Sequence, residues 1–187
     1  MARRWPETDH AVIPNWVYTD PEIFTQELER IFDGPSWLYT CLEAEIPNPG
    51  DFKRSKLGTR EVLAVRGADG GVRVLVNRCA HRSMQVCSAN RGNAREFICP
   101  YHQWTYSLDG KLLGVPFRRG YKGQGGMPAD FEPSEHGLET LSVATRGGVV
   151  FASFDAPNET LETYLGPKML AYFDRVFSGR PLQVLGY

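Results

Sequence analysis

Two short segments that each combine one cysteine with one histidine constrain this chain more than any other feature of its 187 residues. The first is Cys79-Ala80-His81 and the second is Cys99-Pro100-Tyr101-His102. The interval between them is long enough for a hairpin and its turn, so we expect each pair to lie in its own loop. Each loop then supplies one anionic sulfur and one neutral nitrogen, and the two loops approach a shared group from opposite sides.

This set of donors is the pattern of a Rieske [2Fe-2S] cluster, in which two thiolates bind one iron and two imidazoles bind the other. We therefore predict that four side chains bind such a cluster: Cys79, His81, Cys99 and His102. A structural zinc site with two cysteines and two histidines uses the same side chains and is the competing interpretation. Zinc sites usually group the cysteines in one knuckle and the histidines in the other, whereas both segments here are mixed.

Three positions near the ligands set an expectation for the reduction potential. Rieske proteins of respiratory complexes carry an additional cysteine in each loop, and a serine two residues after the second histidine donates a hydrogen bond that raises the potential. This chain has Met84, Tyr101 and Trp104 at those places. With fewer donors aimed at the cluster, we expect a potential near the low end of the Rieske range, about −150 mV.

Further motifs lie around the two segments: Arg82, Trp104, Tyr106, Asp109-Gly110 and Gly114-Val115-Pro116. With them, the chain resembles the N-terminal domain of the large (alpha) subunit of Rieske non-haem iron aromatic-ring-hydroxylating oxygenases. Within that family it looks most like large subunits of the salicylate 5-hydroxylase type, with those of anthranilate and terephthalate dioxygenases nearby. The segments that suggest this are 42–47, 49–52, 116–120, 125–128 and 135–138. One departure is Ser83, where most members have glycine.

The resemblance implies an oxidoreductase, an NADH-dependent mono- or dioxygenase. Its Rieske part accepts electrons from a ferredoxin and/or an NADH reductase and relays them to a mononuclear Fe(II) that hydroxylates a substituted benzoate. In relatives the second-loop histidine bonds to an aspartate beside the mononuclear iron of a neighbouring subunit, so the expected partners include other alpha subunits in a trimer, with a small beta subunit as an optional addition. His102 is the corresponding candidate for the electron exit.

The mononuclear iron of this family is held by two histidines and one carboxylate. Besides the predicted cluster ligands, the chain has only His10 and His136, and both are expected to be surface or loop residues. We therefore expect no catalytic iron site in this chain, and the mononuclear Fe(II) is expected in a catalytic domain that is absent from it. The alternative is a free-standing Rieske electron carrier without its own catalytic site.

The fold class expected from the pattern is mostly β with flanking helices, a Rieske-type antiparallel β-sandwich that holds the iron-sulfur cluster between two loops. Alternation and glycine-rich turns predict hairpins over residues 61–66 with 72–77 and over 138–145 with 148–154. Asp20 and Pro21 predict the start of a helix that Gly34 stops, and helical spacing returns after Glu159, broken at Gly166-Pro167. Residues 181–187 are expected to form a strand that leads into the catalytic domain.

These elements give three expected parts: an N-terminal segment and helix over residues 1–36, a Rieske [2Fe-2S] domain over 37–156, and a helical segment with the start of the absent catalytic domain over 157–187.

Charge and composition exclude other classes. The net charge of −1 argues against nucleic acid as a partner, and no apolar run reaches the length of a membrane span. Cys41 and Cys87 are expected to be packed thiols rather than a disulfide, which fits a reducing cytoplasm. Arg118 and Arg119 could attract an acidic ferredoxin, with solvated surface charges as the alternative.

Overall fold

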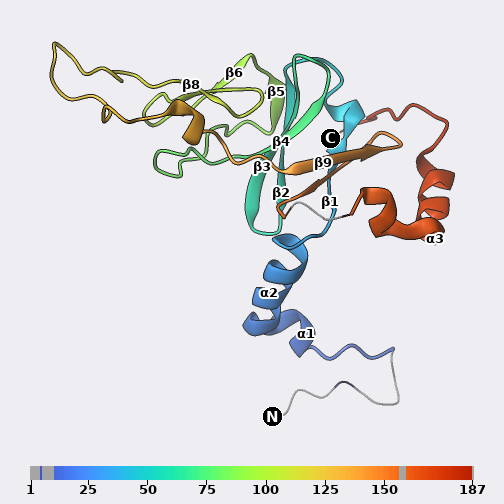
Figure 1. Ribbon diagram of the computed structural model, residues 1–187. Helices are drawn as coiled ribbons and strands as arrows, with labels where there is room; N and C mark the ends of the chain where they lie inside the picture. The colour runs from blue at the N-terminus through green and yellow to red at the C-terminus, as the bar shows by residue number, and fades with distance from the viewer. Residues whose placement is uncertain (1–4, 6–10, 156–158, 187) are drawn as a thin grey trace.

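The computed structural model describes residues 5, 11–155 and 159–186. Its strands form three sheets, and every strand pair is antiparallel (Figure 1). The first sheet has the order β1 (Leu38–Leu42), β10 (Val149–Ser153), β9 (Ser142–Arg146). The second has the order β4 (Val72–Val76), β3 (Arg60–Arg66), β2 (Asp51–Leu57), β5 (Arg91–Asn93), and the third β6 (Glu96–Ile98), β7 (Thr105–Ser107), β8 (Leu112–Gly114). The predicted fold class, mostly antiparallel β with few helices, is confirmed.

The second sheet carries a hydrophobic core on each face. Successive side chains of a strand point to opposite faces, and in β3 the neighbours Val62 and Leu63 are both fully buried. Val62 enters a core shared with Val150 of β10, whereas Leu63 enters a second core that includes Tyr106 of β7. Cys79 belongs to this second core, so one predicted ligand is built into the hydrophobic interior.

Both predicted hairpins are present. β3 and β4 pair around the glycine-rich turn that follows Arg66, and β9 and β10 pair around Gly147 and Gly148, which both have positive φ. Two glycines in this conformation suit a tight turn between antiparallel strands, because they meet no steric penalty there.

The N-terminal helix starts where the sequence predicts. Asp20 caps α2 (Pro21–Glu27), and its Oδ1 accepts a hydrogen bond from the Glu22 amide at 2.9 Å. The expected helix to Gly34 is only partly right, because the α-helix ends at Glu27 and the chain continues as the π-helical turn η1 (Leu28–Phe32). A short helix, α1 (Trp16–Thr19), precedes it, and α1 and α2 extend below the sheets in Figure 1.

The helix that follows the last strand, α3 (Leu161–Phe177), lies beside the first sheet in Figure 1 and is kinked at Gly166, where φ is 69°. This confirms the predicted break at Gly166-Pro167. The predicted strand over 181–187 is wrong for the described residues 181–186, which pair with no strand. Leu182 packs against the Gly148 turn instead, because apolar residues alone cannot form a strand without a partner edge.

Two short 3₁₀ helices, η2 (Glu43–Glu45) and η3 (Pro133–Glu135), complete the elements of the described segments. The segment between β8 and η3 projects away from the sheets in Figure 1, on the side opposite α3. No helix in these segments has both the length and the apolar composition needed to cross a membrane.

Candidate metal centre

The two predicted ligand segments form loops with the same backbone pattern. In the first, the Cys79 amide donates to the Met84 carbonyl at 2.8 Å and the Ser83 amide donates to the Cys79 carbonyl at 2.9 Å. In the second, the Cys99 amide donates to the Trp104 carbonyl and the Gln103 amide donates to the Cys99 carbonyl, both at 2.9 Å. Ser83 and Gln103 also share a φ of 57°. The loop after β4 and the loop between β6 and β7 therefore present their cysteine and histidine in equivalent ways.

The two cysteine side chains are buried together. Cys79 is 3% exposed and Cys99 is 1% exposed, and the two thiols lie close enough for Cys79 to influence the pKa of Cys99. Burial raises the pKa of the Cys99 thiol, while the amides of Tyr101 and His102, which donate hydrogen bonds to its sulfur, oppose that rise. The same amides would stabilise a thiolate, which is the form that binds a metal.

The two imidazoles lie beside each other at the protein surface. The ring centroids of His81 and His102 are 4.6 Å apart, with His81 exposed and His102 half-buried. The buried Trp104 ring stacks on His81 at a centroid distance of 4.8 Å and an interplanar angle of 9°, and this contact fixes the orientation of the imidazole. Partial desolvation, followed by the charges of His102 and Arg82, lowers the pKa of His81 and favours the neutral ring that ligates metals.

Tyr106 is a site residue that sequence reasoning missed in this role. It is fully buried, and its hydroxyl lies 3.1 Å from Cys79 Sγ. The Ala80 amide donates to the same oxygen at 3.2 Å. When Cys79 is a thiolate, its sulfur can only accept, so the Tyr106 hydroxyl is then the donor to it. This hydroxyl partly compensates for the serine hydrogen bond that is missing where the chain has Trp104.

Asn77 is a second residue that the sequence analysis did not identify. It is 3% exposed, and its Oδ1 accepts hydrogen bonds from the amides of Val86 at 3.1 Å and Cys87 at 2.9 Å. Its Nδ2 donates to the Cys87 carbonyl at 2.7 Å. Asn77 therefore ties the end of β4 to the segment that follows the first ligand loop, and it holds that loop at both ends.

The donor set decides which metal group the residues fit. Among the described residues, no three His, Cys, Asp or Glu side chains converge on a point that could hold one metal ion. A zinc ion requires its four ligands around one centre, whereas a [2Fe-2S] cluster of the Rieske type requires one pair of sulfurs and one pair of imidazoles. The paired, buried thiols and the paired surface imidazoles fit the second group.

The chain's other histidines and cysteines are not part of the proposed ligand set. His10 falls outside the described residues, and His136 is a half-buried loop residue whose ring stacks on Phe131 at 4.5 Å. Cys41 is fully buried, as expected. Cys87 is partly buried and packs at the edge of the second core.

Comparison with known proteins agrees with this geometry. Residues 36–128 match the model of the Rieske [2Fe-2S] domain. The chain is 56% identical to the large oxygenase component of salicylate 5-hydroxylase from Ralstonia sp, over 98% of this chain and 44% of that protein. It is 48% identical to the anthranilate 1,2-dioxygenase large subunit of Burkholderia cepacia, over 97% of this chain and 43% of that subunit.

Among solved structures, a naphthalene 1,2-dioxygenase variant bound to phenanthrene superimposes with a TM-score of 0.79 at 32% identity, covering 87% of this chain and 35% of that one. The chain thus spans less than half the length of the relatives that it matches. Those relatives are oxygenase large subunits, and the similarity to the first of them extends over nearly the whole chain. The chain therefore belongs to the Rieske [2Fe-2S] domain family and is a homologue of the large subunits of aromatic-ring-hydroxylating oxygenases.

Proposed function

We propose that Cys79 and Cys99 bind one iron of a Rieske [2Fe-2S] cluster and that His81 and His102 bind the other. The observation that carries the proposal is the pair of equivalent loops, which bring two buried thiols and two surface imidazoles to one place. When bound, the cluster accepts and releases one electron at a time. The role of this chain is then to relay electrons, received from a ferredoxin and/or an NADH reductase, to a mononuclear iron outside it.

The residues of the chain support distinct parts of this role. Backbone amides hold the Cys99 sulfur in place, and Trp104 fixes the ring of His81. His102 is the proposed electron exit, as in the family that the chain resembles. It lies, together with His81, at a depression of about 370 Å³ whose wall is largely apolar and includes Tyr101, Val115 and Phe117. An apolar surface suits a lasting contact, here with a neighbouring large subunit of a trimer.

The proposed substrate is a substituted benzoate, with salicylate first. The support is the name of the relative with 56% identity, a salicylate 5-hydroxylase component, and anthranilate is the rival suggested by the relative with 48% identity. The residues that would contact the substrate lie around the mononuclear iron, so this part of the proposal rests on similarity over the Rieske part.

Metal analysis tests the cluster. Aerobically purified protein should contain about two iron atoms and two acid-labile sulfides per chain and show the visible absorption of a Rieske centre. One zinc ion per chain without sulfide would contradict the proposal.

Turnover tests the relay. In the oxygenase that contains this chain, His102→Cys should retain a cluster but lose NADH-driven hydroxylation, whereas Lys168→Gln, which changes an exposed side chain on α3, should leave turnover intact. A panel of salicylate, anthranilate and terephthalate identifies the substrate. A protein that is reduced and reoxidised but hydroxylates none of them would be a free-standing electron carrier.

A further inference from the structure

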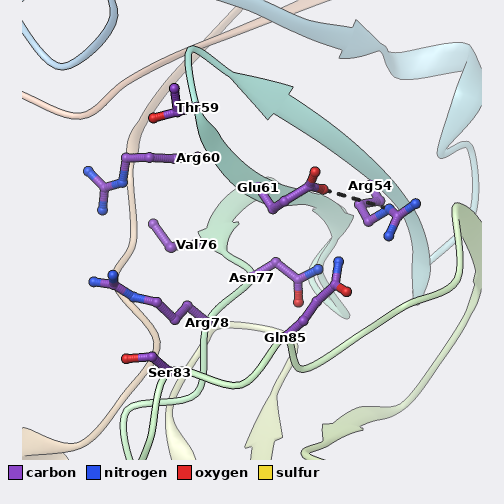
Figure 2. A pocket seen from close by; sticks show the side chains of 9 residues that line it. All are labelled: Arg54, Thr59, Arg60, Glu61, Val76, Asn77, Arg78, Ser83 and Gln85. Atoms are coloured by element: carbon purple, nitrogen blue, oxygen red, sulfur yellow. Dashed lines mark ion pairs between the residues drawn. The ribbon is translucent and has the colours of Figure 1, made fainter. Parts of the chain in front are cut away.

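A pocket of about 620 Å³ opens beside the first ligand loop, between that loop and strands β3 and β4 (Figure 2). Arg78, which directly precedes the ligand Cys79, lines it, and so does Ser83. The Ser83 amide closes the loop by donating to the Cys79 carbonyl at 2.9 Å. The pocket and the ligand loop that carries His81 therefore share a wall.

Three arginines line this pocket with a single acidic residue, Glu61. Arg60 is neutralised by an ion pair with Glu139. Arg54 bonds the uncharged side chain of Asn90, and its Nε lies 3.7 Å from Glu61.

Arg78 is exposed and forms no ion pair or side-chain hydrogen bond within residues 11–155 and 159–186. In Figure 2 its side chain and that of Arg60 extend in the same direction on either side of Val76. The pocket thus has an excess of positive charge, and Arg78 is its unpaired member.

The neutral polar side chains of the pocket add hydrogen-bond donors. Thr59, Ser83 and Gln85 line it, and none of these three side chains bonds to another residue in the part of the chain that the structure describes. Arginine can only donate, and hydroxyl and amide groups can do so as well. A site with free hydrogen-bond donors and positive charge suits a carboxylate, because an ionised carboxylate is negative and can only accept hydrogen bonds.

Charge along the sequence has the same bias. Residues 77–127, which contain both ligand loops, include eight Lys or Arg and two Asp or Glu, a net charge of +6, whereas the whole chain has −1. A basic region in an otherwise acidic chain attracts an acidic partner and speeds its association.

Two surfaces of different character lie beside the ligand loops. The depression that His81 and His102 both line is largely apolar, and the pocket lined by Arg78 and Ser83 is polar and basic. Weak electron-transfer encounters bury little area and are guided by charge, whereas permanent contacts are more apolar. The chain therefore offers one surface suited to a transient partner and another suited to a permanent one.

We infer that the pocket of Arg54, Arg60 and Arg78 is the docking site for carboxylate side chains of an acidic one-electron donor protein, which docks beside the backbone of the first ligand loop. The inference rests on the proposed relay function and names the entry surface for it. In the encounter the donor loses one electron and the domain gains one, and no covalent bond forms or breaks.

The test is the rate of reduction of the cluster-loaded chain by an acidic plant-type [2Fe-2S] ferredoxin, which at about −400 mV is a sufficiently strong reductant. Arg78→Glu should lower the second-order rate constant roughly tenfold at low ionic strength, and the difference from wild type should shrink at high ionic strength. The matched control is Lys168→Glu, an exposed charge reversal on α3, which should change the rate less than about twofold. Arg119→Glu, on the segment between β8 and η3, tests the alternative that Arg118 and Arg119 attract the ferredoxin.

Three control measurements separate an effect on docking from an effect on the cluster itself. All variants should keep the wild-type absorption spectrum, reduction potential and rate of reduction by dithionite, so a lower rate with ferredoxin reports docking alone. If Arg119→Glu slows reduction as much as Arg78→Glu does, or if all three variants slow it equally, the pocket is not the docking site. A wild-type chain that holds no iron-sulfur cluster would overturn the relay function, and with it the inference.

Discussion

At the scale of single residues, the Tyr106 hydroxyl connects the backbone of the first ligand loop to its sulfur. It accepts a hydrogen bond from the Ala80 amide and lies 3.1 Å from Cys79 Sγ. A donor to a ligating sulfur stabilises the reduced, more negative cluster and raises its potential. Tyr106→Phe should therefore lower the potential, by on the order of 50 mV for the loss of one charge-assisted hydrogen bond.

A spectroelectrochemical titration measures this shift in potential. Tyr101→Phe is the matched control, because it removes a phenol hydroxyl from an exposed side chain in the second loop. Equal potentials for wild type and Tyr106→Phe would show that the hydroxyl proton does not point to the sulfur.

Ser83 carries backbone strain in the first loop. Its φ of 57° lies in the left-handed region that glycine adopts without penalty, and its side chain forms no hydrogen bond within the described ranges. Ser83→Gly should stabilise the protein by about 1 kcal/mol, seen as a rise of roughly 2–4 °C in the melting temperature of the cluster-loaded chain. Ser88→Gly, at a position without positive φ, should lower the melting temperature instead. A lower melting temperature for Ser83→Gly would contradict the assignment of strain.

The sequence was sufficient for the proposed ligands but not for the residues around them. Cysteine and histidine at these spacings have few other uses, so the four candidates could be identified without a structure. Tyr106 and Asn77 act through partners that lie 27 and 10 residues away in the sequence, Cys79 and Cys87. Those contacts depend on strand register and loop closure, which no local pattern specifies.

At the scale of elements, an ion pair fastens α3 to the β9–β10 hairpin. Arg146 binds Asp174 through two hydrogen bonds, Nε to Oδ1 at 2.8 Å and Nη2 to Oδ2 at 2.6 Å. Gly147 makes the approach possible, because a Cβ there would lie 2.8 Å from Phe177 Cβ. The hydrogen bonds from Arg146 lower the pKa of Asp174.

A pKa that is lower in the folded state than in the unfolded state adds stability above the unfolded value, about 3.9 for aspartate, and that contribution disappears as the pH falls through the folded value. Asp174→Asn should therefore lower the melting temperature at pH 7, and the gap to wild type should narrow as the pH approaches 3. Asp130→Asn, which changes an exposed aspartate that forms no ion pair within the described residues, is the control and should show no such gap. A gap that stays constant across this range would mean that the ion pair does not contribute.

The strands show which sequence patterns predict structure and which segments carry no usable pattern. The apolar runs that predict β3 and β4 are continuous rather than alternating, because both faces of their sheet are buried. β2 was not predicted, because its two buried apolar residues, Phe52 and Leu57, enter different cores and a polar stretch separates them. β5 has three exposed residues and carries no pattern at all.

At the scale of the whole molecule, the two cores have different sources of stability. The core between the first and second sheets is made of aliphatic side chains and contains none of the proposed ligands. The other core includes Cys79 and Cys99, and the third sheet that covers it has strands of three residues each. Such short strands bury little surface by themselves, so the free energy of metal binding contributes to the folding of this half.

Removal of the cluster should therefore affect the two halves unequally. Hydrogen exchange in apo protein prepared with a chelator should speed up strongly in β6, β7, β8 and the ligand loops, because local opening there no longer breaks metal–ligand bonds. The amides of β1, β9 and β10 should keep most of their protection, because the aliphatic core beneath them loses no contact. Cys79→Ala, which removes one proposed ligand, should reproduce the pattern without a chelator, whereas Cys41→Ala should loosen the aliphatic core instead, because Cys41 is fully buried there. Equal acceleration of exchange in all strands after cluster removal would show that the molecule opens as one cooperative unit and that the metal centre stabilises both cores.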